Sequence, residues 1–433
     1  MMLCSILRPS LPHLLSLRCL GTVASRSAAV KEADILSATL SFEDPRAFRV
    51  KSWGELLRAL AIFRLCSFSI LVNNCGKLMS VTRTLLGSRG FSFLLKPTVY
   101  AQFVAGENES EISESMKKMS SLGLRPMLAV PIEEVLGEST GEKQYDKNME
   151  TMLECVKMSS SNTWSVDPMM QLKITALLSS ELCVKLTTLM SQRSYNLSLL
   201  VKAMDGQHVS FPGLKENEAA HFLCGLQRLN TIAEFNKDGA WIWNTYQCYL
   251  KESRSLLLEA LRLSETEGFC LGVKLVRGAY MDKERKQAER EGQEDPVHGS
   301  WEDTNNSYNG SLDLMLDVIS EKPESYRIIV ATHNEESVRR AAKRMEELNI
   351  NKDGGSVCFG QLLGMCDHVS LTLAQEGYIV YKSVPYGSVD DTLPYLVRRA
   401  QENRTVLQGI RKERDLLRQE LKHRLKLSLK GAS

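Results

Sequence analysis

The stretch YIVYKSVPYG, residues 378–387, is a continuous apolar run that ends in a Pro-Tyr-Gly turn. The next residues, SVDDTLPYLVRRAQEN at 388–403, have a helical pattern. A continuous apolar run, in contrast to an alternating one, is typical of a strand that is buried on both faces of a parallel sheet. We therefore interpret these residues as one strand followed by one helix.

The same unit recurs upstream of this stretch. Six other apolar runs are each followed by a helical pattern: RPMLAV (125–130), KITAL (173–177), AWIWNTYQ (240–247), GVKLVRGAY (272–280), RIIVATHN (327–334) and VCFGQLLG (357–364). Repeated strand–helix units predict either a barrel of parallel strands or a doubly wound sheet.

Two features favour the barrel. No GxGxxG motif follows any of the strands, so the dinucleotide site of a doubly wound sheet has no support. Polar side chains that can bind a ligand occur instead at the C-terminal ends of several strands: Lys173, Gln247, Arg277, His333, Asn334, Gln361 and Ser383. One or two of these would only satisfy loop backbones, but the whole set indicates a site at the end of the barrel that carries the chemistry in such folds. The sequence predicts an α/β fold, a (β/α)8 TIM-type barrel at residues 96–410, preceded by a helical region at 31–95.

Composition excludes several classes of protein. The chain has 433 residues, of which 43% are hydrophobic and 24% charged, as in globular proteins. A net charge of +2 argues against nucleic acid as a partner. The eleven cysteines include no CxxC pair and no Cys/His cluster, so we expect neither a disulfide framework nor a metal site.

The two ends of the chain differ from the barrel. Residues 1–30 contain Arg8, Arg18 and Arg26 but no acidic residue, a composition that predicts a mitochondrial transit peptide. A secretory signal is the alternative, although the arginines interrupt its apolar run. Residues 411–433 form a basic amphipathic pattern, interpreted as a helix that docks on the barrel or touches an anionic membrane.

Two adjacent arginines, Arg398 and Arg399, follow the last strand within a helical stretch. Arginine pairs usually face water. If this helix lies over the barrel mouth, however, the pair can hold a carboxylate through charge-assisted hydrogen bonds. Lys274 and Arg277 of KLVRGAY and His333 of ATHN suit a phosphate, a ribityl hydroxyl or the edge of a flavin, although each signal is weak by itself.

Together these motifs resemble the mitochondrial proline dehydrogenase family, and most closely its hydroxyproline dehydrogenase branch. The segments KLVRGAY, ATHN, FGQLLGMCD, VPYG and PYLVRRAQEN occur in the family's order, and WNTYQCYLK and VYAQFVAGE extend the likeness upstream. The resemblance implies a (β/α)8 barrel that binds FAD non-covalently and oxidises an imino acid, with ubiquinone as electron acceptor. It also implies the matrix side of the inner mitochondrial membrane as the location, with peripheral membrane contact.

The resemblance assigns roles to individual residues. The substrate would contact Lys173, Tyr280, Leu362, Ser383, Tyr395, Arg398 and Arg399. FAD would contact Gln247, Lys274, Arg277, Gly278, Thr332, His333 and Asn334. In this picture the arginine pair holds the substrate carboxylate, while the flavin supplies the redox chemistry.

One substitution bears on the choice of substrate. The family's proline enzymes have a tyrosine in YKYVPYG, where this chain has Ser383. A serine leaves space and offers a hydrogen bond, as a ring 4-hydroxyl group requires. We therefore favour trans-4-hydroxy-L-proline, oxidised to 1-pyrroline-3-hydroxy-5-carboxylate with weak proline oxidation, over proline as the main substrate.

One departure from the family concerns barrel closure. Only seven strands are found, because RLNTIAEFNKDGAWIW runs from a helix directly into a strand where the family has a further strand with a motif resembling VDAEQTY. The missing strand–helix unit leaves an inactive form as one alternative. A Schiff-base aldolase, with Lys173 or Lys274 as nucleophile, is another, because it also uses a strand-end lysine.

Overall fold

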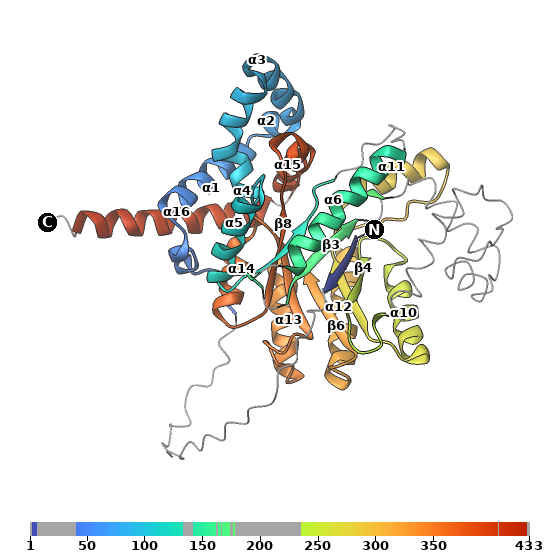
Figure 1. Cartoon of the computed structure of the whole chain (residues 1–433). Coiled ribbons are helices and arrows are strands. Elements are labelled where there is room, and N and C mark those ends of the chain that lie inside the picture. Colours follow the sequence, from blue (N-terminus) through green and yellow to red (C-terminus); the bar gives the residue numbers. More distant parts are fainter. Residues whose placement is uncertain are drawn as a thin grey trace, which may run out of the picture.

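The computed structural model describes residues 2–6, 40–132, 142–161, 163–165, 167–173, 176–177, 235–405 and 407–430. Figure 1 shows a central group of strands with helices around it. A second group of helices, α1, α2 and α3, stands to one side of the strands, and the long helix α16 extends past its base (Figure 1).

Among the described residues, the strands form a closed barrel in the order β1-β3-β2-β8-β7-β6-β5-β4. Seven of them run parallel: β2 (Arg125–Ala129), β3 (Met169–Lys173), β4 (Ile242–Gln247), β5 (Leu271–Val276), β6 (Tyr326–Ala331), β7 (Val357–Leu362) and β8 (Val380–Pro385). The predicted α/β barrel, with one parallel strand fewer than eight, is confirmed.

Strand β1 (Met2–Ile6) takes the remaining position. It runs antiparallel to β3, with Met2 opposite Lys173, and antiparallel to β4, with Cys4 opposite Trp243. The edges of β3 and β4 are therefore covered, although no parallel strand is available for that position. Residues 7–30 of the predicted transit peptide lie outside the described part of the chain, and so do residues 178–234 between β3 and β4.

One strand lies elsewhere than predicted. We expected a strand at KITAL, residues 173–177, but β3 begins at Met169 and ends at Lys173. The prediction was wrong because Gln171 and Lys173 are buried polar residues of this strand, so MMQLK does not look like a continuous apolar run. The shift has a functional consequence, since it makes Lys173 the C-terminal residue of its strand.

The lower part of the barrel interior is filled by side chains. Met127, Met169, Trp243, Ile329, Cys358 and Tyr381 belong to one buried cluster. The ring of Trp243 lies directly against Gly272 of β5, where an added Cβ would collide with the indole. The glycine is therefore required for this close approach. Because side chains fill the interior towards the N-terminal ends of the strands, a ligand site must lie at their C-terminal ends.

Helices cover the outside of the strands. Their bounds are α5 (Glu109–Ser121), α6 (Glu142–Ser160), α10 (Ser253–Glu267), α11 (Met281–Glu291), α12 (Trp301–Glu321), α13 (Glu335–Glu347), α14 (Asp367–Gln375) and α15 (Val389–Thr405). Helices α5, α6, α10, α12 and α14 pack directly on the strands. For example, Tyr308, Leu312 and Leu316 of α12 are fully buried in the main core. This is the spacing that places side chains on one helix face.

The N-terminal helices form a separate layer beside α15. Their bounds are η1 (Pro45–Val50), α1 (Trp53–Cys66), α2 (Ser69–Asn73), α3 (Cys75–Leu95), η2 (Lys96–Tyr100) and α4 (Ala101–Phe103). Helix α1 begins with a capping box between Ser52 and Glu55, as its sequence indicates. Phe91 and Leu95 of α3 share a buried cluster with Tyr395 and Leu396 of α15.

Helix α16 (Leu407–Lys430) docks on this layer. Leu416 and Leu417 are buried, and the guanidinium of Arg424 donates to the backbone carbonyls of Phe48 and Lys51. The basic C-terminal helix thus packs mainly against η1 and α1, and it also contacts α14 and α15 and pairs with Glu335 of α13 through Lys412.

Candidate functional site

Several of the predicted site residues lie at the C-terminal ends of the strands, as expected. Lys173 and Gln247 are the last residues of β3 and β4, and Leu362 is the last residue of β7. Arg277 follows β5 directly, and the ATHN segment spans the end of β6 and the start of α13. These positions come from five different strands, and the closed barrel brings them to one rim.

The two arginines of α15 both stack on aromatic rings. Arg399, only 2% exposed, has its guanidinium carbon 4.7 Å from the ring centre of Tyr395. The guanidinium carbon of Arg398 lies 5.0 Å from the ring centre of Tyr280, at the start of α11. These stacked geometries hold each guanidinium plane in place.

A third cation approaches the same tyrosine. The Nζ of Lys173 lies 6.0 Å from the ring centre of Tyr280 and donates to the backbone carbonyl of Ile132 at 2.8 Å. Lys173 and Arg398 thus meet at one ring, although they come from opposite parts of the sequence. Such a group of cations beside apolar rings is suited to a small carboxylate with a hydrocarbon ring.

Leu362 and Ser383 are neighbours on adjacent strands. They are direct partners in the ladder between β7 and β8, and Ser383 is only 7% exposed. Leu362 also packs against the cluster that contains Tyr395. The structure therefore brings Leu362, Ser383 and Tyr395 to one side of the barrel mouth, next to Arg399.

His333 is held as a neutral imidazole. The backbone N–H of Leu362 donates to its Nε2 at 3.2 Å, so the proton of the neutral ring resides on Nδ1. Burial, together with the positive charges of Lys382 and Arg399, lowers the pKa of His333 to about 3. The ring can therefore donate one hydrogen bond from Nδ1 without carrying a charge.

Three other predicted cofactor residues have local structural tasks. The side-chain oxygen of Asn334 accepts from the backbone N–H of Ser337 at 2.9 Å and so caps α13. The hydroxyl of Thr332 accepts from the backbone N–H of Asn334 at 3.1 Å. Gln247 accepts a hydrogen bond from the hydroxyl of Tyr249 at 2.6 Å. These contacts fix the side chains in position, which a binding role also requires.

Arg277 has unused hydrogen-bonding capacity. One of its terminal nitrogens donates to the hydroxyl of Ser337, and its guanidinium carbon lies 4.9 Å from the ring centre of Tyr308. Its Nε and Nη1 are buried and have no hydrogen-bond partner among the described residues. Burial lowers the pKa of Arg277. Buried donors of this kind call for an acceptor, and a flavin cofactor offers carbonyl and phosphate oxygens.

The remaining two predicted cofactor residues flank Arg277. Lys274 is 6% exposed and lies within β5, opposite Thr245 and Ile329 of the neighbouring strands. Gly278 lies in the turn after β5, and an added Cβ would reach only the end of the Met281 side chain at 3.6 Å. The chain itself thus imposes no need for a glycine there, in contrast to Gly272.

The family model for proline dehydrogenase matches residues 112–412, which include the whole parallel barrel and α15. The chain belongs to the proline dehydrogenase family.

Curated members of this family cover almost the whole chain. The hydroxyproline dehydrogenase of Xenopus laevis is 49% identical over 460 residues, covering 98% of this chain and 96% of the relative. The hydroxyproline dehydrogenase of Homo sapiens is 42% identical, and the match covers 89% of this chain and 94% of the relative. Proline dehydrogenase 1, mitochondrial, of Homo sapiens is 29% identical and covers 88% of each. The Xenopus alignment is longer than this chain, so part of that relative has no counterpart here.

A solved structure supports the fold. The proline utilization A protein of Bdellovibrio bacteriovorus, inactivated by N-propargylglycine, superposes with a TM-score of 0.55 at 20% identity. The match covers 83% of this chain but only 38% of that much longer protein.

In this proline dehydrogenase fold, sequence reasoning missed a buried ionic cluster behind the site. Lys382 of β8 donates to the backbone carbonyls of Leu362 at 3.1 Å and Met365 at 2.8 Å, and it pairs with Asp367 at 2.8 Å. The carboxylate of Asp367 also accepts a hydrogen bond from the Nζ of Lys51 at 2.6 Å. Burial acts to raise the pKa of Asp367, but the two lysine cations outweigh it and hold the pKa well below its usual range.

The C-terminal helix closes this cluster from outside. The carboxylate of Glu413 in α16 accepts from the backbone N–H groups of Cys366 at 3.0 Å and Asp367 at 2.9 Å, and so caps the start of α14. The turn before α14 is strained, since Cys366 has a positive φ of 56°. Gly364 is required there because its φ is 74° and the backbone carbonyl of Gln102 occupies the place of a Cβ. In the sequence, Asp367 of FGQLLGMCD was the one residue that could have indicated this buried ionic cluster.

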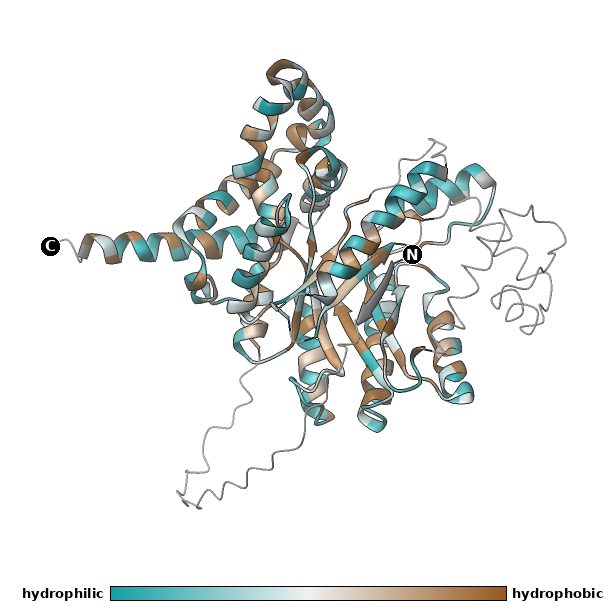
Figure 2. Ribbon diagram, in the orientation of Figure 1, coloured by the Kyte–Doolittle hydropathy of each residue, from teal (hydrophilic) through white to brown (hydrophobic). Residues whose placement is uncertain are grey.

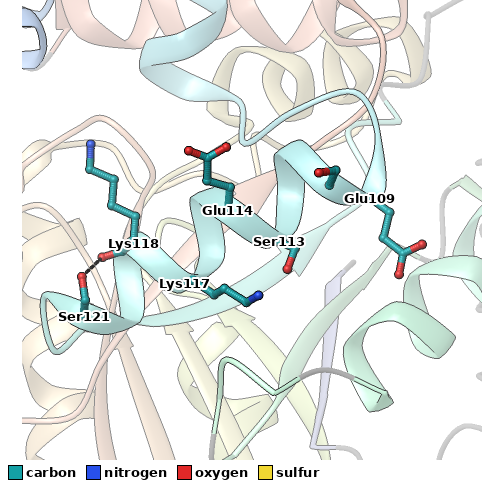
Figure 3. A pocket seen from close by; sticks show the side chains of 7 residues that line it. Glu109, Ser113, Glu114, Lys117, Lys118 and Ser121 are labelled. Carbon is teal, nitrogen blue, oxygen red and sulfur yellow. Dashed lines mark hydrogen bonds between the residues drawn. The ribbon is translucent and has the colours of Figure 1, made fainter.

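A surface hollow on α5 lies apart from these residues. Figure 3 shows the side chains that line it: Glu109, Ser110, Ser113, Glu114, Lys117, Lys118 and Ser121. All of them belong to one helix, and none belongs to a strand end. The buried face of α5 consists of Ile112, Met116 and Met119, so the hollow lies on the opposite, outer face and is not the active site.

Proposed function

We propose that this member of the proline dehydrogenase family oxidises trans-4-hydroxy-L-proline to 1-pyrroline-3-hydroxy-5-carboxylate, with weak activity on proline. FAD is the cofactor and ubiquinone the electron acceptor, at the matrix side of the inner mitochondrial membrane. The relatives named hydroxyproline dehydrogenase, 40–49% identical, support this choice over the proline enzymes at 28–29%.

The observation that carries the proposal is the arrangement of Arg398, Arg399 and Lys173 around Tyr280 and Tyr395. Guanidinium groups bind a carboxylate through paired hydrogen bonds. The aromatic rings and Leu362 offer apolar contact to a five-membered ring. An imino acid presents both groups within a few ångströms, so one small molecule can contact the cations and the rings together.

The residues present fit a flavin. Arg277 supplies two buried nitrogens that lack acceptors among the described residues, and His333 supplies a neutral donor at Nδ1. With Gln247, Lys274, Gly278, Thr332 and Asn334, they would hold FAD along the rim of β4, β5 and β6. When bound, FAD supplies the acceptor for the hydride that leaves the ring carbon beside nitrogen. The protein orients the substrate ring and excludes water.

Ser383 supports the hydroxylated substrate. It lies beside Leu362 at the rim and carries a hydroxyl where the proline enzymes have a phenol. A hydroxyl that bonds the 4-hydroxyl group of the substrate discriminates against a ring that lacks it, because the protein group would then be left unpaired.

A specific observation supports an alternative, an inactive form. Part of the Xenopus relative has no counterpart in this chain, and the barrel position between β3 and β4 is held by an antiparallel strand from the N-terminus. If residues 1–30 are removed as a transit peptide, β1 is removed with them. The edges of β3 and β4 would then be exposed, which disfavours a stable barrel.

An absorption spectrum of the purified full chain tests the proposal. We expect flavin bands that bleach when hydroxyproline is added under anaerobic conditions, and bleach more slowly with proline. Flavin bands that respond only to proline would assign the chain to the proline enzymes. Absence of flavin, with cooperative unfolding intact, would favour the lysine-based aldolase, and absence of cooperative unfolding would favour the inactive form.

A further inference from the structure

The N-terminal helices expose an unusual number of large apolar side chains. Among the described residues of α1, α2, α3 and their links, the side chains more than 40% exposed are Trp53, Leu57, Leu65, Phe68, Ile70, Leu78, Val81, Leu85, Leu86, Phe93 and Leu94. Figure 2 shows this concentration of apolar residues on the helices that stand away from the barrel. A concentration of large exposed apolar side chains of this kind marks an interaction site.

Helix α3 is the strongest case. Only Cys75, Phe91 and Leu95 of its residues are buried, although its apolar residues lie all around it. Leu85 is 78% exposed and Phe93 84% exposed. A helix that is apolar on all sides normally lies in a protein core or in contact with lipid.

Beyond Glu55, the charged residues of α1, α2 and α3 are all basic, although Arg83 pairs with Asp390 of α15 and Lys96 of η2 pairs with Glu107. No acidic residue occurs between Glu55 and Glu107, whereas six basic residues do: Arg58, Arg64, Lys77, Arg83, Arg89 and Lys96. Large apolar side chains interspersed with lysine and arginine suit a membrane surface that carries anionic headgroups. A self-complementary protein interface would not normally repeat one sign of charge.

We infer that α1, α2 and α3 form a surface that docks on an anionic lipid bilayer, with the apolar side chains in the headgroup region and the basic side chains on the headgroups. No helix among the described residues is long and apolar enough to cross a membrane. The surface adjoins the site, because Arg83 of α3 pairs with Asp390 of α15 at 3.0 Å. α15 carries Arg398 and Arg399. The inference deepens the proposed function in one respect, since docking here brings the barrel mouth close to a lipid-soluble acceptor.

Vesicle flotation with the purified full chain tests the inference. We compare vesicles of phosphatidylcholine alone with vesicles of equal parts phosphatidylcholine and phosphatidylglycerol. We expect binding to the anionic vesicles only, and we expect it to weaken strongly when salt is raised from about 0.1 to about 1 M, because the Debye length shortens from about 10 to about 3 Å. Equal binding to both vesicles, or none to either, would overturn the inference.

Two sets of variants locate the surface. Lys77→Gln with Arg89→Gln should weaken binding about 25-fold, since each basic residue near an anionic surface contributes roughly fivefold. Leu85→Ser with Phe93→Ser should weaken it roughly tenfold per side chain, because the apolar groups no longer enter the bilayer. Neither pair lies among the proposed substrate or cofactor residues.

Matched controls come from the opposite side of the barrel. Leu256 and Leu258 of α10 are 51% and 47% exposed, so Leu256→Ser with Leu258→Ser removes comparable apolar area. Arg262→Gln with Lys343→Gln removes two charges from α10 and α13. These variants should bind vesicles like the parent. If the controls lose as much binding as the surface variants, the docking surface is not on α1, α2 and α3.

Two further readouts separate the alternatives. Light scattering without vesicles reports the oligomeric state, and a change from dimer to monomer in Leu85→Ser with Phe93→Ser would mean that a second copy covers the surface, contrary to the inference. Turnover with a water-soluble dye as acceptor should be unchanged in the surface variants. A parent that binds vesicles but oxidises no imino acid would contradict the proposed function and leave the docking surface intact.

Discussion

The Nζ of Lys382 lies 2.8 Å from Oδ1 of Asp367, and Lys382 is 1% and Asp367 7% exposed. The pair links the last strand of the barrel to the first residue of α14. Through the bonds of Lys382 to the carbonyls of Leu362 and Met365, it also fixes the backbone that presents Leu362 to the site. A pair this deeply buried is sensitive to the loss of either partner.

Asp367→Asn should therefore destabilise the protein strongly. It leaves the cations of Lys51 and Lys382 buried without their counter-charge, which costs about 3–5 kcal/mol for buried pairs. The free energy of unfolding from a denaturant titration measures this change. Glu265→Gln removes an exposed ion pair with Lys322 and serves as control, with little or no expected loss of stability. Equal losses in the two variants would show that the buried pair contributes no more than a surface pair.

Arg399→Ala and Arg398→Ala should each weaken substrate binding. A hydrogen bond to a charged group contributes about 1.5–3 kcal/mol, so we expect kcat/KM to fall roughly ten- to a hundredfold per variant. Steady-state kinetics with hydroxyproline measures this loss. Arg340→Ala, which breaks a pair with Asp313 on the outer helices, is the control. If kcat/KM is unchanged in both site variants, the arginines do not contact the substrate.

Ser383→Tyr should shift preference from hydroxyproline towards proline. A phenol at this rim position fills the space beside Leu362 and collides with a ring hydroxyl group. The quantity to measure is the ratio of kcat/KM for the two substrates, because a bulky ring also lowers both values together. Ser383→Ala, which removes the hydroxyl but leaves the space, should change the ratio less. An unchanged ratio in Ser383→Tyr, with flavin bound, would return the assignment to proline.

His333 should make stability depend on pH. Its pKa is about 3 in the folded protein and 6.5 ordinarily, because burial disfavours the charged ring. Below pH 6.5 the unfolded chain binds a proton that the folded protein does not bind until about pH 3. The contribution of the neutral His333 ring to the free energy of unfolding is thus complete above pH 6.5. It is lost as pH falls from 6.5 towards about 3, by up to about 1.4 kcal/mol per pH unit.

His333→Gln should remove this dependence. The free energy of unfolding of the variant should fall less steeply than that of the parent between about pH 6.5 and about pH 4, whereas the two slopes should agree between about pH 7 and pH 8. Denaturant titrations across this range measure both slopes. Parallel curves over the whole range would mean that His333 titrates alike in the folded and unfolded chains.

A version of the chain that carries a parallel strand and helix between β3 and β4 should be more stable and bind FAD more tightly. A parallel partner extends the ladder on both edges, where β1 pairs five residues of β3 but only two of β4. Melting temperature and flavin content measure the difference. Equal values for the two versions would show that β1 closes the barrel as well as a parallel strand does.

Most of the barrel was predictable because its determinants are local. Six of the seven parallel strands were located from continuous apolar runs, and the strand-end residues follow from their position in each run. β3 was placed wrongly because its Gln171 and Lys173 are buried in the barrel interior, a condition that the local pattern does not reveal. The position of β1 was likewise unpredictable, since nothing in a five-residue N-terminal segment indicates which strands it pairs with.

The sequence by itself determined the family, the order of the parallel strands and the residue types at the barrel rim, since apolar periodicity and short motifs act over a few residues. Only the tertiary structure decided which of these residues meet. Arg398 reaches the ring of Tyr280, and Glu413 caps α14, across separations in the chain that no local pattern encodes. Such contacts depend on barrel closure and on the docking of α16, which fix the distances between groups that are remote in sequence.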